Sequence, residues 1–338
     1  MKQLILKIGV GILKVAYLPF RLCKIKNKIT YMSRQSDNMS LDLEILVSKV
    51  QTEYPEIKNV VMTRKIVGGK KSIITYPFHM IRQMYHLATS KVVIVDGYCI
   101  VVCVLPHKKE TKVIQMWHAA AAIKKFGYQT IDKYSGSDHK TATIMKMHYN
   151  YDYVLAPSKA TGFHYCEALG IESEKLVYIG LPHFSELSVF DRNEEMNSVY
   201  PELKTKKNIL YIPTFRKGEC VRLEELIKGV DFQNYNLIAR LHPLEKLEVI
   251  DEKVIVDTQF TVYDWIKKAD IIVADYSSLI IECALLEKQT YFFLYDIDKY
   301  SQDPGLNINF GDEEIEQFMF HDGTGLKELL EKKDVNIN

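Results

Sequence analysis

The sequence predicts an α/β protein with two Rossmann-like domains, each built on a parallel sheet, that face each other across an interdomain cleft. The first observation is an alternation of short apolar runs, typical of buried strands, with longer stretches typical of helices. The second is the length of 338 residues, which is enough for two domains with a core each. The third is a polar stretch at 190–208, rich in Asn, Glu and Lys, which marks a boundary between them.

The composition is that of an ordinary folded chain, with 47% hydrophobic and 26% charged residues. The formal net charge of +1 gives no reason to expect nucleic acid as a partner. Six cysteines are scattered without a C-x-x-C pair, so we expect reduced thiols and a cytoplasmic location. The chain has neither a G-x-G-x-x-G turn nor a Walker A loop, which argues against a dinucleotide or P-loop site.

Residues 1–28 carry seven basic side chains and no acidic one, with apolar residues between them. Lys7, Lys14 and Arg21 fall on one face of a helix because they are spaced seven residues apart. The lysines interrupt the apolar run too often for a bilayer span, and no signal-peptide cleavage site follows. We expect an amphipathic helix, which Pro19 could break, lying on an anionic membrane surface. The alternative is a cationic helix packed on its own domain.

The first domain is expected over 29–200, with helical stretches near 41–52, 77–89, 140–149 and 158–169. Its strand candidates are Ile29–Met32, Asn59–Met62, Lys91–Val95, Ile100–Val104, Val113–Trp117, Tyr153–Ala156 and Leu176–Ile179.

The second domain is expected over 206–325, followed by a helical tail at 326–338. Helical stretches near 221–229, 261–268 and 278–287 separate five strand candidates. These are Asn208–Ile212, Leu237–Leu241, Lys253–Val256, Ile271–Ala274 and Tyr291–Leu294.

His118 comes directly after a strand candidate of the first domain, before the small residues Ala119–Ala122. Histidine titrates near neutral pH, so His118 is a candidate to accept a proton from an attacking hydroxyl. Its place at a strand end, with Lys124 and Lys125 shortly after, favours a functional role over a purely structural one.

Two polar motifs end strands of the second domain. Thr214 and Arg216 follow its first strand, and Arg240 and His242 stand at the tip of the next, which Pro243 ends. Arginine and histidine together suit a cluster of anionic oxygens. Each motif alone would fit an ordinary surface strand end equally well.

The stretch 269–282 carries the most information, because a buried strand is followed by a polar turn, Asp275-Tyr276-Ser277-Ser278, and then a helix. Ser277 or Ser278 can cap that helix, and Glu282 lies in its first two turns. A helix N-terminus after a parallel strand presents free N–H groups and a positive dipole end, so the turn is a candidate phosphate site. An ordinary strand-to-helix turn is the alternative.

Together these motifs resemble the CDP-glycerol glycerophosphotransferase family of wall teichoic acid synthesis, over about residues 90–325. The resemblance rests on Trp117-His118, Pro213-Thr214-Phe215-Arg216, Arg240-Leu241-His242-Pro243, Asp275-Tyr276-Ser277-Ser278, Phe292-Phe293-Leu294-Tyr295-Asp296 and Pro304-Gly305-Leu306-Asn307. One departure is Ala119–Ala122, where the family typically has His-Gly and a proline-containing turn. This alanine run could continue into a helix, and it leaves the acceptor open.

The resemblance implies a GT-B-like fold and transfer of a polyol phosphate from CDP-glycerol or CDP-ribitol to a hydroxyl of a lipid-linked teichoic acid precursor, with release of CMP. His118 would be the base and His242 a second catalytic residue. Arg216, Arg240 and His242 would neutralise the diphosphate, while Ser277 and Ser278 hold phosphate oxygens. Further residues that it implies are Thr214, Asp275 and Glu282 on the donor side, and Lys124 and Lys125 on the acceptor side.

Several points stay open at this stage: glycerol or ribitol as the polyol, and one priming transfer or polymerisation. No cofactor is expected, and the pair Asp296 and Asp298 is not expected to bind a metal. We expect peripheral attachment to the cytoplasmic face of the membrane. The competing functions are a GT-B glycosyltransferase that uses a nucleotide sugar, and an inactive membrane scaffold of the same pathway.

Overall fold

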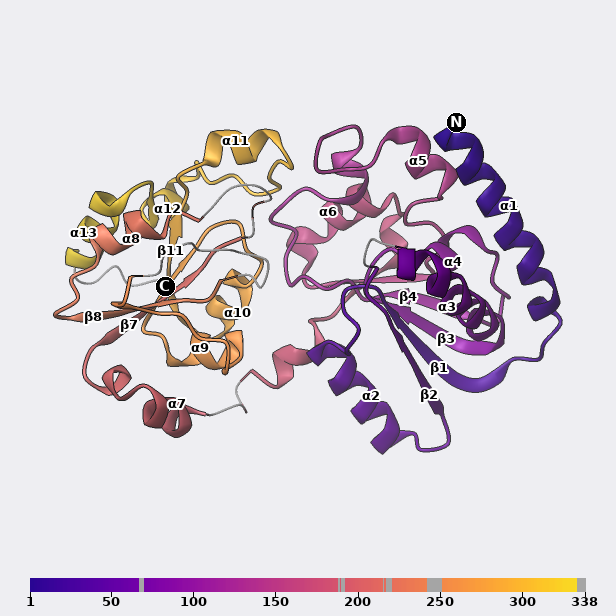
Figure 1. The fold of residues 1–338 in the computed structure, drawn as a ribbon, viewed down its shortest axis with the longest axis horizontal. Coiled ribbons are helices and arrows are strands. Elements are labelled where there is room, and N and C mark those ends of the chain that lie inside the picture. The colour runs from indigo at the N-terminus through magenta and orange to yellow at the C-terminus, as the bar shows by residue number, and fades with distance from the viewer. Residues whose placement is uncertain are drawn as a thin grey trace. The chain divides into compact units, whose positions relative to one another are not determined.

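The computed structural model of the chain describes residues 1–66, 70–187, 189, 192–214, 216, 221–241 and 251–332 (Figure 1). The chain divides into two compact units, Met1–Phe184 and Ser185–Asn338. This division comes earlier than residue 200, where the first domain was expected to end. The reason lies in the contacts of the intervening segment with the second unit.

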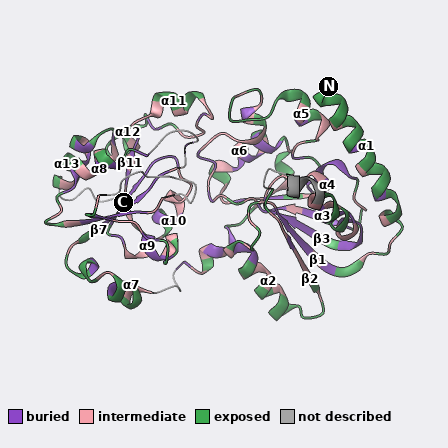
Figure 2. Ribbon diagram, viewed as in Figure 1, coloured by how far each residue is buried: buried purple, intermediate pink, exposed green. Residues whose placement is uncertain are grey.

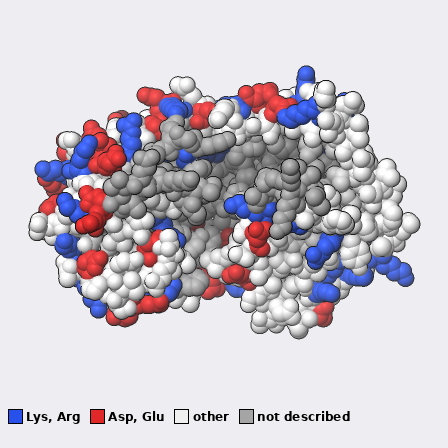
Figure 3. All heavy atoms as spheres, in the orientation of Figure 1, with Lys and Arg blue, Asp and Glu red and all other residues white. Residues whose placement is uncertain are grey.

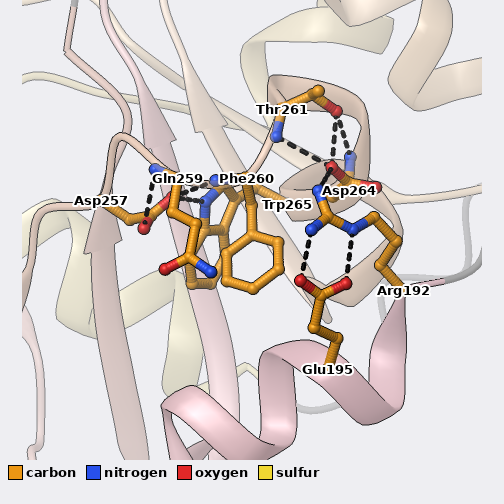
Figure 4. Close-up of polar contacts among 8 residues, drawn as sticks. All are labelled: Arg192, Glu195, Asp257, Gln259, Phe260, Thr261, Asp264 and Trp265. Carbon is orange, nitrogen blue, oxygen red and sulfur yellow. Dashed lines mark hydrogen bonds and ion pairs between the residues drawn. The ribbon is translucent and has the colours of Figure 1, made fainter.

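Helix α7 (Asn193–Val199) contacts helix α9 (Val262–Lys268), and Figure 4 shows the part of this contact that Arg192 makes. Arg192, just before α7, pairs with Glu195 at 2.5 Å and with Asp264 of α9 at 3.7 Å. Lys268 donates to the Asn197 side chain at 2.7 Å. The polar stretch at 190–208 therefore includes a helix that belongs to the second unit and packs there against α9.

The first unit contains one sheet of six strands in the order β2-β1-β3-β4-β5-β6, and every pair is parallel. From β1 the chain moves outward to β2 and then crosses back to β3 on the other side of β1. The strand order therefore reverses between β1 and β3. The strands are β1 (Lys26–Ser33), β2 (Lys58–Thr63), β3 (Ser90–Val95), β4 (Lys112–Gln115), β5 (Tyr153–Ala156) and β6 (Leu176–Tyr178).

Helices cover this sheet, and Figure 2 shows the strands as largely buried while the helices keep exposed faces. The core is aliphatic with a few tyrosines, and Tyr151 and Tyr165 are among its largest side chains. The helices are α1 (Lys2–Arg21), α2 (Leu41–Glu53), α3 (Lys70–Thr89), α4 (Ile100–Val104), α5 (His139–Ile144) and α6 (Lys159–Leu169).

The strand expected at Ile100–Val104 is wrong, because this run forms helix α4. Four of its five residues are buried, so the helix has apolar contacts all round. A short continuous apolar run of this kind fits a buried strand and a buried helix equally well, and periodicity cannot separate them. The Ala119–Ala122 run also departs from expectation, because it forms no helix.

Helix α1 confirms the helix expected at the N-terminus, and Pro19 lies inside it near its end. One face, including the buried Val10 and Tyr17, packs on its own unit against α3 and α5. By length and composition alone this helix is sufficient to cross a membrane, so its lysines do not exclude a span as the sequence interpretation assumed.

The second unit repeats the architecture of the first. Its sheet has six parallel strands in the order β12-β11-β10-β7-β8-β9, one more than the five expected. The order reverses between β7 and β10. The strands are β7 (Lys207–Ile212), β8 (Tyr235–Ala239), β9 (Val254–Ile255), β10 (Ile271–Ala274), β11 (Gln289–Phe293) and β12 (Met319–Phe320).

The helices of the second unit are mostly short. Helix α10 begins at Ile280, after Leu279 as its N-cap residue and without a side-chain cap. The capping expected from Ser277 or Ser278 is therefore wrong. Besides α7 and α9, the helices are α8 (Leu223–Gly229), α10 (Ile280–Leu285), α11 (Ile297–Gln302), α12 (Glu313–Glu316) and α13 (Gly323–Glu331).

Candidate functional site

Each sheet has one switch point, the place where the strand order reverses, and the predicted site residues lie near these two places. In open parallel sheets, ligands bind at the carboxyl ends of the strands beside such a point. In the first unit the switch point lies between β1 and β3, and His118 follows the neighbouring strand β4. In the second unit it lies between β7 and β10, which precede Thr214 and Asp275 respectively.

His118 is exposed, and its ring has a defined orientation. Its Nδ1 lies 2.8 Å from the backbone oxygen of Asp96, at the carboxyl end of β3. A carbonyl oxygen can only accept, so Nδ1 carries the hydrogen and donates it. In the neutral ring the lone pair is then on Nε2, which is the form that a general base needs.

The backbone before His118 is unusual. Trp117 has φ of 63°, in the left-handed region that large side chains rarely adopt. Its indole packs against the rings of Phe126 and His118, with centroids 4.6 Å apart in both cases. These contacts hold a conformation that the backbone alone disfavours, and they fix where His118 leaves the strand.

The acceptor-side candidates Lys124 and Lys125 are partly buried and follow the irregular segment Ala119–Ala122. Tyr165 donates to the Ala119 carbonyl at 3.1 Å, which ties this segment to α6. Gly127, just after Phe126, has φ of 56°, and a Cβ there would lie 2.0 Å from the Ala168 oxygen. The turn beyond the two lysines therefore requires glycine.

Arg216 in the second unit is buried between two carboxylates. Its Nε and Nη2 donate to Asp296 at 2.6 and 3.0 Å, and its Nη1 donates to Asp275 at 2.8 Å. Burial opposes the charge of Arg216, but the hydrogen bonds to Asp296 and the charge of Asp275 outweigh burial and raise its pKa. The guanidinium also lies 4.8 Å from the centroid of the Tyr295 ring. These contacts favour a positioning role.

Asp275 is fully buried and organises the turn after β10. It accepts from the backbone N–H of Thr214 at 2.9 Å and from that of Tyr276 at 2.6 Å. Asp275 thus joins the ends of β7 and β10, the two strands that flank the switch point. The hydroxyl of Thr214 is buried and has no hydrogen-bond partner among the residues that the structure describes, so it is a candidate to bind a ligand.

Arg240 follows β8, and its guanidinium donates to the backbone oxygen of Asp257. The Asp257 carboxylate accepts from Phe260 N and Trp265 Nε1 at 2.8 and 2.9 Å (Figure 4). Burial raises the pKa of Asp257, but these hydrogen bonds outweigh it, so the pKa is lowered. The loop that supports Arg240 is therefore rigidly hydrogen-bonded.

Ser277 and Ser278 are partly buried in the turn before α10, and Glu282 is buried within that helix. Ser277 Oγ accepts from the backbone N–H of Leu279 at 3.4 Å. His242 lies outside the described residues. Among the residues that the structure describes, no group of three or more His, Cys, Asp or Glu could hold a metal. Asp296, one of the acidic pair considered for a metal, accepts from Arg216 and, at 3.0 Å, from Tyr276.

The structure adds residues that the motifs did not contain. Arg34 and Gln35 follow β1, and Asp96 and Tyr98 follow β3, so all four lie at the switch point of the first unit. The signal that could have found them is their place directly after two apolar strand candidates. These four residues are recognised as one group only when β1 and β3 are known to be neighbouring strands.

Two parallel α/β units in one chain define the GT-B-like class of fold. The solved structure of the wall teichoic acid polymerase TagF matches 97% of this chain and 87% of its own, with a TM-score of 0.68 and 18% identity. At that identity the likeness shows the fold alone.

The model of the CDP-glycerol:poly(glycerophosphate) glycerophosphotransferase family matches residues 15–333, and the chain belongs to this family. A teichoic acid ribitol-phosphate primase of Bacillus spizizenii is 30% identical over 89% of this chain and 82% of its own. A teichoic acid glycerol-phosphate primase of Bacillus subtilis is 32% identical over 69% of this chain and 63% of its own. The family and the enzyme class expected from the motifs, a polyol-phosphate transferase, are confirmed.

Proposed function

We propose that this enzyme transfers glycerol phosphate or ribitol phosphate from its CDP derivative to a hydroxyl of a lipid-linked teichoic acid precursor. The hydroxyl oxygen forms a bond to the phosphorus that bears the polyol. The bond from that phosphorus to the CMP oxygen breaks, and its electron pair leaves with CMP. The proton of the hydroxyl goes to Nε2 of His118.

The observation that carries this proposal is the 2.8 Å contact between His118 Nδ1 and the Asp96 carbonyl, from which we assign the tautomer. The Nδ1 of His118 is committed to the Asp96 carbonyl, while the ring is exposed beside a switch point. A base must present an unprotonated nitrogen to the hydroxyl, and this arrangement presents Nε2. The family membership supplies the reaction for which such a base is needed.

On the donor side, we propose that Thr214, Arg240, Ser277 and Ser278 contact the CDP group. This proposal is supported by the position of these residues at the carboxyl ends of β7, β8 and β10, around the second switch point. Asp275 and Arg216 hold these strand ends together through buried contacts. His242, Glu282, Lys124 and Lys125 keep the roles that the family resemblance implies. We propose no metal or other cofactor.

We also propose that α1 attaches the enzyme to the cytoplasmic face of the membrane. Its outward face is an apolar stripe whose members are each more than half exposed: Leu4, Ile5, Ile8, Ile12, Val15, Leu18 and Leu22. The surface over α1 is largely uncharged in Figure 3. Because Lys7, Lys14 and Arg21 run along the helix beside this stripe, the composition suits an anionic lipid surface.

The experiment that tests the transfer is CMP release from CDP-glycerol and from CDP-ribitol, each without an acceptor, with a lipid-linked disaccharide analogue, and with such an analogue that ends in a glycerol phosphate. Release that requires the acceptor, with one donor, would establish the reaction and identify the polyol. If folded protein releases CMP from neither donor, the proposal fails. A nucleotide-sugar glycosyltransferase or an inactive scaffold would then be the remaining hypotheses.

A further inference from the structure

The switch point of the first unit contains a pocket of about 280 Å³, close to the lower end of the usual range for small-molecule sites. Arg34, Gln35, Asp96 and Tyr98 are among the residues that line it. None of them belongs to a motif of the family resemblance. The pocket lies wholly within one unit, between the carboxyl ends of β1 and β3.

Arg34 gives this pocket a fixed positive charge. Its Nη1 donates to the Tyr98 carbonyl at 2.8 Å, and its guanidinium lies 5.5 Å from the centroid of the Tyr98 ring. The Nε of Arg34 is buried and has no hydrogen-bond partner within the described parts of the chain. A buried donor without a partner is costly, and an anionic oxygen in the pocket would satisfy it.

The pocket also offers an acceptor. Asp96 is 3% exposed, and its side chain is hydrogen-bonded to Ser33 at the end of β1. A cation and a carboxyl group in one small pocket suit a ligand that has both a phosphate and hydroxyl groups. An uncharged sugar would leave the guanidinium without a counter-charge, and inorganic phosphate has no polyol hydroxyl for Asp96.

Two of the residues that line the pocket also contact His118, the proposed base. The backbone oxygen of Asp96 accepts from His118 Nδ1, and Gln35 Nε2 lies 3.3 Å from that same nitrogen. The pocket therefore shares Asp96 and Gln35 with the surroundings of His118 Nδ1, although His118 itself is not among its lining residues.

We propose that this pocket binds the terminal polyol phosphate of the acceptor, with Arg34 on its phosphate and Asp96 on a polyol hydroxyl. The enzyme would then act on acceptors that already end in a polyol phosphate. This inference rests on the proposed function, because it names what the acceptor side of that site recognises.

The first test is calorimetric binding of sn-glycerol 3-phosphate, glycerol and inorganic phosphate to the full chain. We expect glycerol 3-phosphate to bind more tightly than either of the others. R34Q should weaken it at least ~10-fold, because a charged hydrogen-bond donor is lost. Arg82 is exposed on α3, so R82Q is the matched control and should bind like the wild type. Equal binding by R34Q and the wild type would overturn the proposal.

The second test compares acceptor analogues that end in glycerol phosphate with analogues that end in an uncharged sugar. R34Q should raise the KM for the phosphate-terminated acceptor at least ~10-fold and leave the KM for the CDP donor within about twofold. R34K, which keeps the charge, should lie between R34Q and the wild type. Thermal unfolding of each variant checks that it is folded.

The outcomes separate the two proposals. A higher KM for the donor and an unchanged KM for the acceptor would assign Arg34 to the donor diphosphate and overturn the inference. If the wild type releases no CMP at all, the proposed function fails, while the calorimetric comparison still decides whether the pocket binds a polyol phosphate.

Discussion

His118 and Arg216 each follow a strand beside a switch point, but their surroundings differ. His118 is exposed, with one ring nitrogen fixed by the Asp96 carbonyl. Arg216 is 7% exposed, and its guanidinium is bound by Asp275 and Asp296. The surroundings of His118 leave its Nε2 free to react, whereas the guanidinium of Arg216 is used to join strand ends. At the residue scale, a sequence motif therefore predicts where a side chain lies in the fold, but it does not predict what that side chain does.

Replacing His118 by Ala or Gln should lower kcat for polyol-phosphate transfer at least ~100-fold, the usual scale for loss of a general base. Binding of the CDP donor should change little, because His118 lies in the other unit from the donor-side residues. Acceptor-dependent CMP release checks this expectation, and H139A, at an exposed histidine on α5, is the control. An unchanged rate in H118A would remove His118 from the mechanism.

Replacing Arg216 by Gln should lower the free energy of unfolding by about 3–5 kcal/mol, because the buried Asp275 and the partly buried Asp296 would both lose their counter-charge. Urea unfolding of the two proteins measures this difference. Arg222 is exposed and lies 5.0 Å from the same Tyr295 ring, so R222Q is the matched control and should cost less than about 1 kcal/mol. If R216Q keeps full stability and instead raises the KM of the donor, Arg216 is the diphosphate clamp.

Helix α1 shows what an element can tell beyond its single residues. Its buried side chains, such as Val10 and Tyr17, face its own unit, while a second apolar stripe faces outward. The two hypotheses from the sequence, a packed helix and a membrane-surface helix, are therefore compatible. Each hypothesis accounts for a different face.

The double substitution I8E and I12E should reduce binding of the full chain to anionic vesicles at least ~100-fold, since each exposed isoleucine would otherwise bury apolar area in lipid. Vesicle co-sedimentation measures the loss, and thermal unfolding should show no destabilisation. V199E, at an exposed apolar residue of α7, is the control and should bind as the wild type does. Undiminished binding of the double variant would place the membrane contact elsewhere.

At the scale of the whole molecule, the described histidines whose pKa is lowered by burial are unequally distributed. His79, His86 and His148 all lie in the first unit, and burial lowers the pKa of each, to about 4 for His86 and His148. In the second unit the pKa of the Asp257 carboxyl is lowered instead. The two units should therefore respond to acid in different pH ranges.

Between about pH 6.5 and 4, the unfolded chain binds protons at these histidines and the folded first unit does not. Its stability should therefore fall as the pH falls through this window, by about 3 kcal/mol from His148 alone. Asp257 should weaken the second unit only at lower pH, near the ordinary carboxylate range.

Comparing thermal unfolding at pH 7.5 and pH 5 tests this. H148N should show a smaller decrease in Tm than the wild type, and asparagine suits the positive φ of 57° at this position. H139N, at an exposed histidine, should behave as the wild type does. An equal decrease in H148N would contradict the role of His148.

The sequence predicted most of the fold because parallel strands covered on both faces are short, apolar and easy to recognise. The run Ile271–Ala274 and its polar turn are an example, and the structure confirms that strand. The helix at Ile100–Val104 was not predictable, because its apolar pattern is also that of a strand. The site was predictable only where residues follow one another in the chain. Arg216 meets Asp296 across 80 positions, and Arg34 meets Tyr98 across 64.

The orientation of His118 depends on a main-chain oxygen, and this has an evolutionary consequence. No point substitution at position 96 deletes that oxygen, whereas every substitution there changes the side chain that lines the pocket. If this pocket binds the acceptor and His118 is the base, as we propose, substitutions at position 96 can change the acceptor preference without removing the oxygen that orients His118. Mutational scanning at position 96 would detect the effect of the Asp96 side chain, but it would not detect the role of the backbone oxygen.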